Sequence, residues 1–529
     1  MAGTTTQTIK EILKGVFGYD QFREGQEAII GNVLAGRHTF VVMPTGGGKS
    51  LCYQVPALIQ EGVAVVVSPL IALMKNQVDR LHAVGLNAAF INSTLPKKAV
   101  DEVRKGVLSG ATKLLYMSPE SLTKKENLTF LQQVHISFIA VDEVHCISDW
   151  GHDFRPEYRN IKTALDQAFG ALPILGLTAT ATPKVQQDIL KNLAIEDATL
   201  FRYSFNRDNL YYSVKPKVQA EKELIKFIKS HPNASGIVYC QSRKKVEELA
   251  TLLNLNGIQS APYHAGLESK VRVHHQDAFL SKKVEVMVAT IAFGMGIDKP
   301  DVRFVIHYDV PRSLEGYYQE TGRAGRDGLA SICLMFYSAE DIIRIEKFNK
   351  SKPAAEREKS QSLLRAMETY AVSGVCRRKQ LLHYFGETYS QNCNYCDNCQ
   401  HPPQTYSGED CVKMVIIAVQ QTQERFGTDH IVHLLRGIED HYIKSYRHHM
   451  LSIFGKGSAR DKAFWQSVIN QMLLLALLSK DVGDASALKV TKAGGIFLEK
   501  GYPILLYEDN TYASSDHDEQ PTTINRGQE

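Results

Sequence analysis

Short apolar runs alternate with longer amphipathic stretches along the first part of the chain. Five runs rich in valine and isoleucine end at a polar residue, glycine or proline, at residues 38–44, 63–70, 113–120, 137–143 and 173–180. Apolar strands separated by helical segments are typical of a parallel sheet wound with helices. The pattern therefore predicts an α/β lobe over residues 1–205.

The same pattern begins again after residues 202–216, which show no clear periodicity. Further apolar runs follow at residues 235–240, 284–290, 303–308 and 331–337. They predict a second lobe over residues 206–340, so the expected fold class is α/β with two parallel-sheet lobes.

The character of the sequence changes after residue 340. Residues 341–385 are helical and charged, and a segment rich in cysteine and proline follows, so a small metal-stapled module is expected over residues 341–407. Residues 408–507 combine helical patterns with a hairpin near residues 479–490, which predicts a winged-helix domain. Residues 508–529 have almost no apolar side chains and are expected to form a disordered acidic tail.

Length and charge limit the class of protein. A chain of 529 residues exceeds a single hydrophobic core, so several domains are expected. The net charge is +4, but residues 508–529 carry six acidic residues against one arginine, which leaves +9 for residues 1–507. This mildly basic body permits an anionic partner without requiring one.

No run approaches the roughly twenty apolar residues of a membrane helix, and the N-terminus lacks a signal-peptide core, so an intracellular chain without membrane contact is expected.

A strand, a glycine-rich loop and a helix follow one another at residues 40–58. Successive glycines let backbone N–H groups approach phosphate oxygens, and the new helix adds the positive end of its dipole. Lys49 would bridge the β- and γ-phosphates, and Ser50 would bind Mg²⁺. Met43 stands where the generic motif has glycine. A loop that only needs flexible glycines is the alternative, which the Lys-Ser pair at the helix start disfavours. The predicted phosphate-binding residues are Thr45, Gly46, Gly47, Gly48, Lys49 and Ser50.

Two further segments would complete a hydrolytic site. Asp142 and Glu143 follow an apolar strand, and they would hold Mg²⁺ and activate the attacking water, respectively. Arg323 and Arg326 lie three residues apart among glycines of the second lobe, where they would neutralise charge on the γ-phosphate when a cleft closes. A solvated basic turn is the alternative for the arginines.

Four of the nine cysteines cluster in the sequence, with sixteen, two and two residues between them. Four thiolates at such spacings make a closed tetrahedral site for a structural Zn²⁺. An iron–sulfur cluster is the chemical alternative. The predicted ligands are Cys376, Cys393, Cys396 and Cys399.

With these motifs in place, the chain resembles the RecQ DNA helicases of superfamily two over about residues 10–500. The stretches that carry the resemblance are residues 17–26, 43–58, 68–78, 142–158, 177–182, 290–309 and 317–328. Met43 is normal for that family. The chain looks like a short form without the small C-terminal helical domain, HRDC, that many RecQ proteins carry.

The resemblance implies roles that spacing does not show. It implies two RecA-like motor lobes, adenine stacking on Tyr19, and recognition of the base by Arg23 and Gln26, so that ATP is the nucleotide. It favours zinc at the cysteines and adds Gln319 to the catalytic set. It also implies contacts to the DNA strand from Ser242, Arg243 and Thr290.

The winged helix of the family grips duplex DNA, and here the sequence leaves two interpretations equally open. The basic and aromatic side chains of the domain would either contact DNA or form a solvated face with Trp465 in the core. These side chains are Arg447, His448, His449, Arg460, Lys462 and Trp465.

An aromatic loop follows the carboxylates directly. Trp150, His152, Phe154 and Arg155 would stack on and grip single-stranded bases, in agreement with the role of this loop in the family. Packing of Trp150 and Phe154 under the edge of the sheet is the alternative. A loop that joins both chemistries would make ATP hydrolysis depend on bound DNA.

The resulting expectation is an ATP-dependent 3′–5′ DNA helicase that unwinds duplex, forked or junction DNA in repair, recombination and the SOS response. Its cofactors would be ATP, Mg²⁺ and Zn²⁺. A monomer in the bacterial cytoplasm, associated with the nucleoid, is expected, with single-strand-binding protein and other repair proteins as partners. The alternatives are an RNA helicase of the same superfamily and a zinc and winged-helix DNA-binding regulator with a vestigial ATP site.

Overall fold

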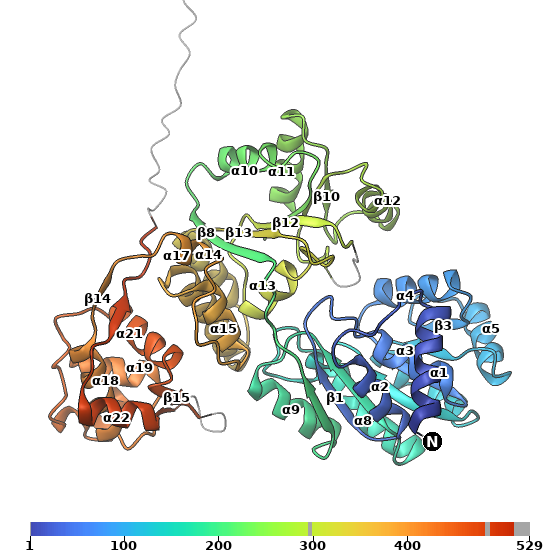
Figure 1. Ribbon diagram of the computed structural model, residues 1–529, viewed down its shortest axis with the longest axis horizontal. Helices are drawn as coiled ribbons and strands as arrows, with labels where there is room; N and C mark the ends of the chain where they lie inside the picture. The colour runs from blue at the N-terminus through green and yellow to red at the C-terminus, as the bar shows by residue number, and fades with distance from the viewer. Residues whose placement is uncertain (1, 295–298, 482–486, 513–529) are drawn as a thin grey trace, which may run out of the picture.

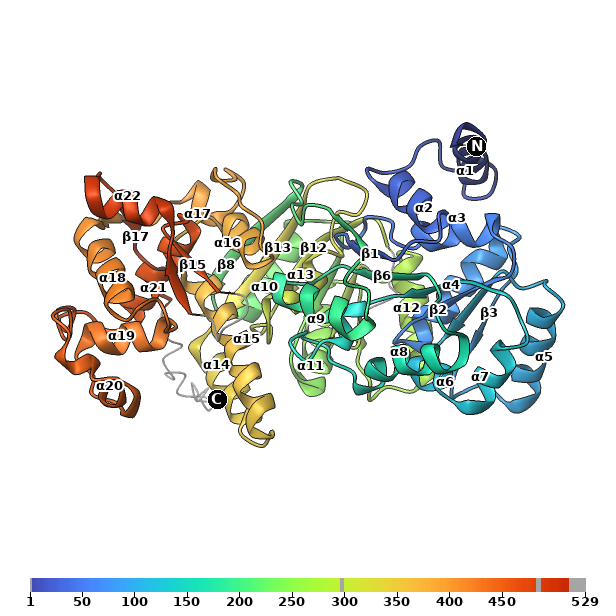
Figure 2. The same cartoon turned by 90° about the horizontal axis from the view of Figure 1, so that it is seen from below.

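The computed structural model describes residues 2–294, 299–481 and 487–512. Two α/β lobes, a helical module and a second small domain follow one another along the chain (Figure 1). In the view from below, the last domain lies at the opposite end of the molecule from the first lobe (Figure 2). None of the helices in the described residues has the length and apolar character needed to cross a membrane.

The first lobe is built on a parallel sheet, which has seven strands within the described residues, in the order β3-β4-β2-β5-β6-β1-β7. Strands β1, β2, β4 and β6 are buried along their whole length, which explains their unbroken apolar runs. The strands are β1 Thr39–Val42, β2 Val63–Val67, β3 Ala88–Ile91, β4 Leu114–Met117, β5 Ile136–Val141, β6 Ile174–Thr178 and β7 Thr199–Arg202. The helices are α1 Ala2–Gly15, α2 Gln26–Leu34, α3 Leu51–Ile59, α4 Ile71–Ala83, α5 Lys97–Leu108, α6 Pro119–Leu122, α7 Lys125–Leu131, η1 Val144–Ile147, α8 Pro156–Phe169 and α9 Pro183–Leu193.

The second lobe has a parallel sheet of six strands in the described residues, in the order β10-β11-β9-β12-β13-β8. Strand β8 occupies the edge of this sheet, inside the stretch that shows no periodicity in the sequence. Only one neighbour pairs with an edge strand, so its burial and its apolar pattern are less regular. The strands are β8 Leu210–Pro216, β9 Ser235–Tyr239, β10 Ser260–Tyr263, β11 Val286–Ala289, β12 Val302–His307 and β13 Ser331–Tyr337, and the helices are α10 Ala220–Lys229, α11 Arg243–Leu255, α12 Ser269–Leu280 and α13 Leu314–Thr321.

The helical module and the last domain complete the molecule. The module contains α14 Ala339–Asn349, α15 Ala354–Val372, α16 Arg377–Tyr384 and α17 Asp397–Gln400. The last domain contains β14 Thr405–Ser407, α18 Glu409–Gln421, α19 Thr428–Arg436, α20 His441–Ser445, η2 His448–Met450, α21 Lys462–Leu474, β15 Leu478–Lys480, β16 Leu488–Val490, α22 Lys492–Lys500 and β17 Leu505–Tyr507. Strands β15 and β16 form the predicted hairpin, whose tip, residues 482–486, lies outside the described residues.

Trp465 belongs to the core of the last domain. Its side chain is buried, and its indole N–H donates a hydrogen bond to the carbonyl of Gly457 at 2.9 Å. Of the two interpretations of the winged-helix side chains, the core position is therefore the correct one for Trp465.

The expected disorder over residues 508–529 is wrong for the first five of these residues. The Ser467 hydroxyl donates to Asp509 at 2.9 Å, Asn510 donates to the Ser373 carbonyl at 3.1 Å, and the Tyr512 hydroxyl donates to the Ala371 carbonyl at 3.0 Å. Polar side chains make these contacts, so a prediction based on low apolar content missed them. Residues 513–529 lie outside the described residues.

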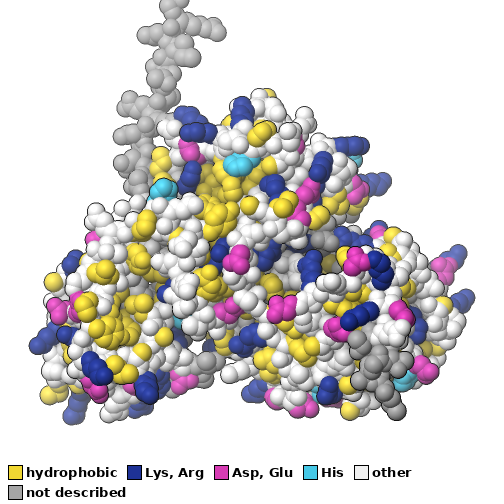
Figure 3. Space-filling model, in the orientation of Figure 1, with side chains coloured by type: hydrophobic (Ala, Val, Ile, Leu, Met, Phe, Trp, Pro, Cys, Tyr) yellow, Lys and Arg dark blue, Asp and Glu magenta, His cyan; other side chains and the backbone are white. Residues whose placement is uncertain are grey.

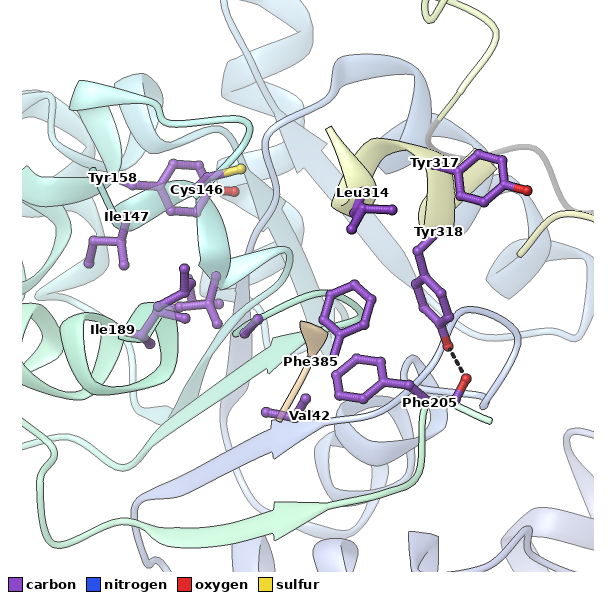
Figure 4. Close-up of a cluster of buried hydrophobic side chains, with 14 of the residues drawn as sticks. Val42, Cys146, Ile147, Tyr158, Ile189, Phe205, Leu314, Tyr317, Tyr318 and Phe385 are labelled. Atoms are coloured by element: carbon purple, nitrogen blue, oxygen red, sulfur yellow. Dashed lines mark hydrogen bonds between the residues drawn. The ribbon is translucent and has the colours of Figure 1, made fainter. Parts of the chain in front are cut away.

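One apolar core joins both lobes and the helical module. Val42 and Ile189 contribute to it from the first lobe, Leu314 and Tyr317 from the second, and Phe385 from the module (Figure 4). The surface is indented between the two lobes (Figure 3). Because both lobes share this core, residues at their facing edges lie within reach of one another.

Candidate functional site

The glycine-rich loop connects β1 to α3 and has the backbone conformation that its glycines allow. Gly46 and Gly48 adopt left-handed φ values of 83° and 84°. A Cβ atom on Gly47 would lie 2.5 Å from the side chain of Met43. Met43 therefore fills the space under the loop, which explains why methionine suits this position. Thr45 Oγ1 is buried without a hydrogen-bond partner among the described residues, as fits a group that faces a bound nucleotide.

Lys49 lies at the end of this loop, beside the carboxylate pair. Its ammonium group donates to the Met43 carbonyl at 3.2 Å. Burial lowers its pKa, while the charges of Glu143 and Asp142 act in the opposite direction. The lysine and both carboxylates thus lie close to one another, as the sequence predicts.

Asp142 and Glu143 follow β5 directly and differ in their electrostatics. Burial and the charge of Glu143 raise the pKa of Asp142 to about 7. Burial would also raise the pKa of Glu143, but the nearby charge of His145 outweighs it and lowers that pKa to about 2. The Nδ1 atom of His145 lies 3.3 Å from Oε2 of Glu143. Glu143 also has a left-handed φ of 46°, a conformation that costs free energy in a residue other than glycine.

His145 is the partner that sequence motifs did not single out. Burial would lower its pKa, but the neighbouring Cys146 sulfur and the Glu143 carboxylate raise it to about 10. The raised pKa favours a protonated imidazole, whose Nδ1 also lies 3.0 Å from Thr178 Oγ1. The predicted base is held in an ion pair inside the first lobe.

The second lobe brings one of its two predicted arginines to the phosphate loop. A Cβ atom on Gly46 would lie 3.5 Å from the Arg326 side chain, and the charge of Arg326 contributes to the lowered pKa of Lys49. Arg323 is buried and donates to the Gly294 carbonyl within its own lobe. Gln319 on α13 reaches across and donates to Thr180 Oγ1 of the first lobe at 3.0 Å.

The predicted adenine-binding residues contact the phosphate loop. The buried Gln26 amide donates to the Gly48 carbonyl at 3.0 Å, and the Arg23 guanidinium donates to the Gly46 carbonyl. Tyr19 leaves 56% of its surface exposed. Gln26 and Arg23 therefore support the predicted phosphate loop, and the exposed Tyr19 ring is accessible for stacking.

The aromatic loop after η1 presents its predicted residues in different ways. Trp150 is 49% exposed, and the Lys184 ammonium lies 3.1 Å from the centroid of its ring. His152 stacks on His145 with ring centroids 4.8 Å apart, and burial together with that neighbour lowers the pKa of His152 to about 3. Arg155 donates to the Pro69 carbonyl at 2.9 Å. Trp150 alone among these three faces outward.

Phe154, the remaining aromatic residue of the loop, is half-buried between two cations. The Arg159 guanidinium carbon lies 5.6 Å from the ring centroid, and the Lys359 ammonium of α15 lies 5.9 Å from it. Lys359 belongs to the helical module. The loop thus touches the first lobe on one side and the module on the other.

The predicted strand-gripping residues of the second lobe lie at one edge of its sheet. Ser242 follows β9 and caps α11 by accepting from the Lys245 N–H at 3.1 Å, and Arg243 next to it is exposed. Thr290 follows β11, which pairs with β9 in parallel. All three therefore lie at the carboxyl ends of neighbouring strands.

The four predicted cysteine ligands converge in the helical module. Their sulfur atoms all lie within 4.8 Å of one another, and Cys393 Sγ and Cys399 Sγ are 3.8 Å apart. The Cys393 N–H donates to Cys376 Sγ at 3.4 Å, which favours a thiolate there. Four converging sulfurs fit a tetrahedral Zn²⁺ with no open position for a substrate.

Arg207 is a residue of this region that the sequence analysis missed. It lies between β7 and β8 and donates to carbonyls of both lobes, at Thr45 and at Gly325. It stands in the stretch without periodicity and in none of the motifs discussed above, so no local signal marks it.

The two parallel-sheet lobes carry a phosphate loop, paired carboxylates and the turn that contains Arg323 and Arg326, here called the arginine turn, at their facing edges. This combination defines a nucleotide-driven helicase motor. Family comparisons agree. The chain matches DEAD/DEAH box helicase over residues 23–189, helicase conserved C-terminal domain over residues 219–328, RecQ zinc-binding over residues 339–400 and RQC domain over residues 402–515.

Curated relatives narrow the class. The chain is 42% identical to ATP-dependent DNA helicase RecQ of Haemophilus influenzae, over 94% of this chain and 81% of the relative. It is 40% identical to ATP-dependent DNA helicase RecQ of Bacillus subtilis, over 84% and 76%. The chain belongs to the RecQ family and is an ATP-dependent DNA helicase with a zinc-binding module and an RQC winged-helix domain. This assignment excludes a regulator with a vestigial ATP site.

Solved structures show the same fold in more distant proteins. S. cerevisiae Dbp5 bound to RNA and ADP BeF3 has a TM-score of 0.52 at 18% identity, covering 68% of this chain and 91% of that chain. The DEAD-box helicase Mss116 bound to ssRNA and UDP-BeF has a TM-score of 0.53 at 17% identity, covering 88% and 89%.

Proposed function

We propose that the cleft between the lobes hydrolyses ATP and that hydrolysis moves the protein 3′ to 5′ along one DNA strand, unwinding forked and junction DNA in repair and recombination. The observation that supports this proposal is the meeting of Lys49, the carboxylate pair and Arg326 at one place, with groups from both lobes. The polarity and the pathway rest on membership of the RecQ family.

The residues divide the chemistry between them. Lys49 and the N–H groups of residues 46–48 bind the phosphates, and Arg326 neutralises charge that builds up as the terminal phosphate leaves. Glu143 orients the attacking water and accepts its proton. Tyr19, Arg23 and Gln26 are assigned to the adenine ring.

Ser50 and Asp142 would hold Mg²⁺, and the partly buried Asp142, whose pKa is raised, fits that role because a cation would favour its charged form. When bound, the ion would supply charge neutralisation on the phosphates.

The ion pair between Glu143 and His145 supports a coupling mechanism. A carboxylate with a pKa of about 2 is a poor proton acceptor, so the free enzyme holds its base in check. His145 belongs to η1, which leads into the aromatic loop, and His152 of that loop stacks on it. DNA that displaces the loop would move His145, raise the pKa of Glu143 and activate hydrolysis.

The K49A variant tests the hydrolytic site. We expect DNA-stimulated ATP hydrolysis to fall more than about 100-fold, because a positioned cation on the phosphates contributes several kcal/mol. K105A, which changes an exposed lysine of the same lobe, is the matched control. Substantial hydrolysis by K49A would contradict the assigned site, and equal unwinding of 3′- and 5′-tailed duplexes by the parent would contradict the polarity.

The proposal extends to the oligomeric state of the protein, its location and its partner. We propose that it works as a monomer in a bacterial cytoplasm, in contact with single-strand-binding protein, as the resemblance to RecQ proteins implies. Light scattering measures the molar mass in solution with and without DNA, and a mass of one chain would support the monomer.

A further inference from the structure

The segment between the two lobes, residues 203–209, carries a side chain that reaches both halves of the nucleotide site. Arg207 Nη1 donates to the Thr45 carbonyl of the phosphate loop at 3.2 Å. Its Nη2 donates to the carbonyls of Ala324 and Gly325 at 3.1 and 2.8 Å. These two residues lie between Arg323 and Arg326. One guanidinium group therefore links the phosphate loop of the first lobe to the arginine turn of the second.

The arginine turn depends on this segment for its position. Asn209 Nδ2 donates to the Gly325 carbonyl and to the Leu329 carbonyl, both at 2.9 Å. A Cβ atom on Gly325 would lie 2.3 Å from the same amide nitrogen, so glycine is required there for the close approach. Because a planar guanidinium fork holds its acceptors in fixed directions, a shift of Arg207 would move the turn and Arg326 with it.

The segment itself is held by the zinc-binding module. The buried Arg378 of α16 donates to the carbonyls of Arg207, Asp208 and Leu210 at 3.2, 3.2 and 2.9 Å. The Glu387 carboxylate accepts from the Ser204 hydroxyl at 2.7 Å and from the Phe205 N–H. The connection between the lobes is therefore fixed along most of its length.

Aromatic packing adds a third anchor to the segment. Phe205 stacks on Phe385 of the module with ring centroids 4.4 Å apart, and the Tyr318 hydroxyl of α13 donates to the Phe205 carbonyl at 2.9 Å (Figure 4). Tyr318 precedes Gln319 on the helix that ends at the arginine turn. The module, the segment and the turn thus form one packed unit.

We propose that Arg207 is a positioning residue for ATP hydrolysis, which holds the Arg326 turn against the phosphate loop in the geometry that the reaction requires. This inference rests on the role of Arg326 given above. Arg207 would act through the turn and the loop, and its contribution would appear in the rate of the chemical step more than in nucleotide affinity.

The test compares R207Q and R207K with a matched control, R303Q. Arg303 also anchors the arginine turn, through Asp327 at 2.6 Å, but it does so within the second lobe alone. We expect R207Q to lower kcat of single-strand-stimulated ATP hydrolysis by about 10- to 100-fold, because small displacements of catalytic groups cost that much. KM for ATP should stay within about twofold in all variants. R207K should be intermediate, because it keeps the charge without the fork, and R303Q should resemble the parent.

A double-mutant cycle that combines R207Q with R326A tests this inference separately from the assigned role of Arg326. In the R326A background, R207Q should lower kcat by less than about twofold, since the group that Arg207 positions is absent. An R326A variant with the parent's kcat would refute the role of Arg326. If R326A is impaired, three results would overturn the inference: R207Q with the parent's kcat, R207Q and R303Q with equal losses, or losses that multiply in the double variant. The zinc content and the melting temperature of each variant check its folding.

Discussion

Asp142 shows how one residue can be costly to the fold and useful to the reaction. Its pKa is raised to about 7 by burial and by the charge of Glu143. A carboxyl group whose pKa is higher in the folded than in the unfolded chain stabilises the fold below about pH 4, and this contribution is lost as the pH rises through about 7. At pH 8 without nucleotide, the ionised Asp142 therefore destabilises the first lobe.

The D142N variant should remove this cost together with the activity. We expect its melting temperature at pH 8 to exceed that of the parent by at least about 2–4 °C, the shift that 1 kcal/mol produces in a domain of this size. The gain should shrink towards pH 4, where the parent carboxyl group is protonated as well. Scanning calorimetry from pH 4 to 8 measures it, with the exposed E102Q as the control. A gain that is constant with pH would show that charge is not its cause.

At the scale of residues, the sequence predicted groups that lie in a motif and missed groups that act on backbone carbonyls. Lys49, Asp142 and Glu143 come together as expected because the segments that carry them follow strands β1 and β5, which belong to one parallel sheet. Arg207 was missed because its acceptors, at residues 45, 324 and 325, are distant in the sequence. Any residue type supplies a carbonyl, so no residue pattern announces such a contact.

Among the elements, the aromatic loop connects the nucleotide site with the surface. His152 of the loop and His145 of η1, which precedes the loop, lie beside Glu143, while the Trp150 ring is half-exposed against Lys184. The ring is available for stacking on a base, a contact that contributes about 1–3 kcal/mol. The alternative that Trp150 packs under the edge of the sheet is therefore wrong, whereas His152 and Arg155 do pack inward.

The W150A variant should make ATP hydrolysis less dependent on bound DNA. We expect single-stranded DNA to stimulate its ATP hydrolysis about tenfold less than that of the parent, because one stacked base corresponds to about 1.4 kcal/mol. ATP binding and DNA-independent hydrolysis should change less than about twofold, since the ring lies outside the phosphate site. L255A, an exposed apolar residue on α11, is the control. Trp465 is the second of the two tryptophans and is buried, so in a W465F background quenching of Trp150 by DNA reports the contact directly. Unaltered DNA stimulation in W150A would show that the ring does not report DNA binding to the site.

Elements with strong periodicity were predicted well, and weakly patterned ones were not. The central strands are buried on both faces and appear as apolar runs, whereas β8 at the edge alternates with polar residues and was missed. Residues 508–512 are ordered by side-chain hydrogen bonds to the module and to α21 of the last domain, which apolar content does not reveal. In both cases tertiary contacts, and not local propensity, determine the structure.

For the whole molecule, a chain of polar contacts joins the second lobe to Glu143, the proposed catalytic base. Gln319 donates to Thr180 Oγ1 at 3.0 Å across the cleft, and the Thr180 N–H donates to Thr178 Oγ1 at 3.1 Å. Thr178 Oγ1 lies 3.0 Å from His145 Nδ1, which is paired with Glu143. Relative movement of the lobes that breaks the first of these bonds would therefore alter the surroundings of Glu143.

If this path transmits closure of the cleft, its first two members, Gln319 and Thr180, should act as a unit. We expect Q319A and T180V each to lower kcat of DNA-stimulated hydrolysis by about five- to tenfold, which corresponds to the ~1–1.4 kcal/mol of a neutral hydrogen bond. The double variant should be no slower than the slower single variant, because both changes remove the same bond. Steady-state kinetics of the four proteins give the coupling energy, and Q132A, which removes an exposed hydrogen bond to the Ala168 carbonyl inside the first lobe, is the control. Losses that multiply would mean that Gln319 and Thr180 contribute separately, and closure would then have to reach Glu143 by another route, of which the aromatic loop is the nearest.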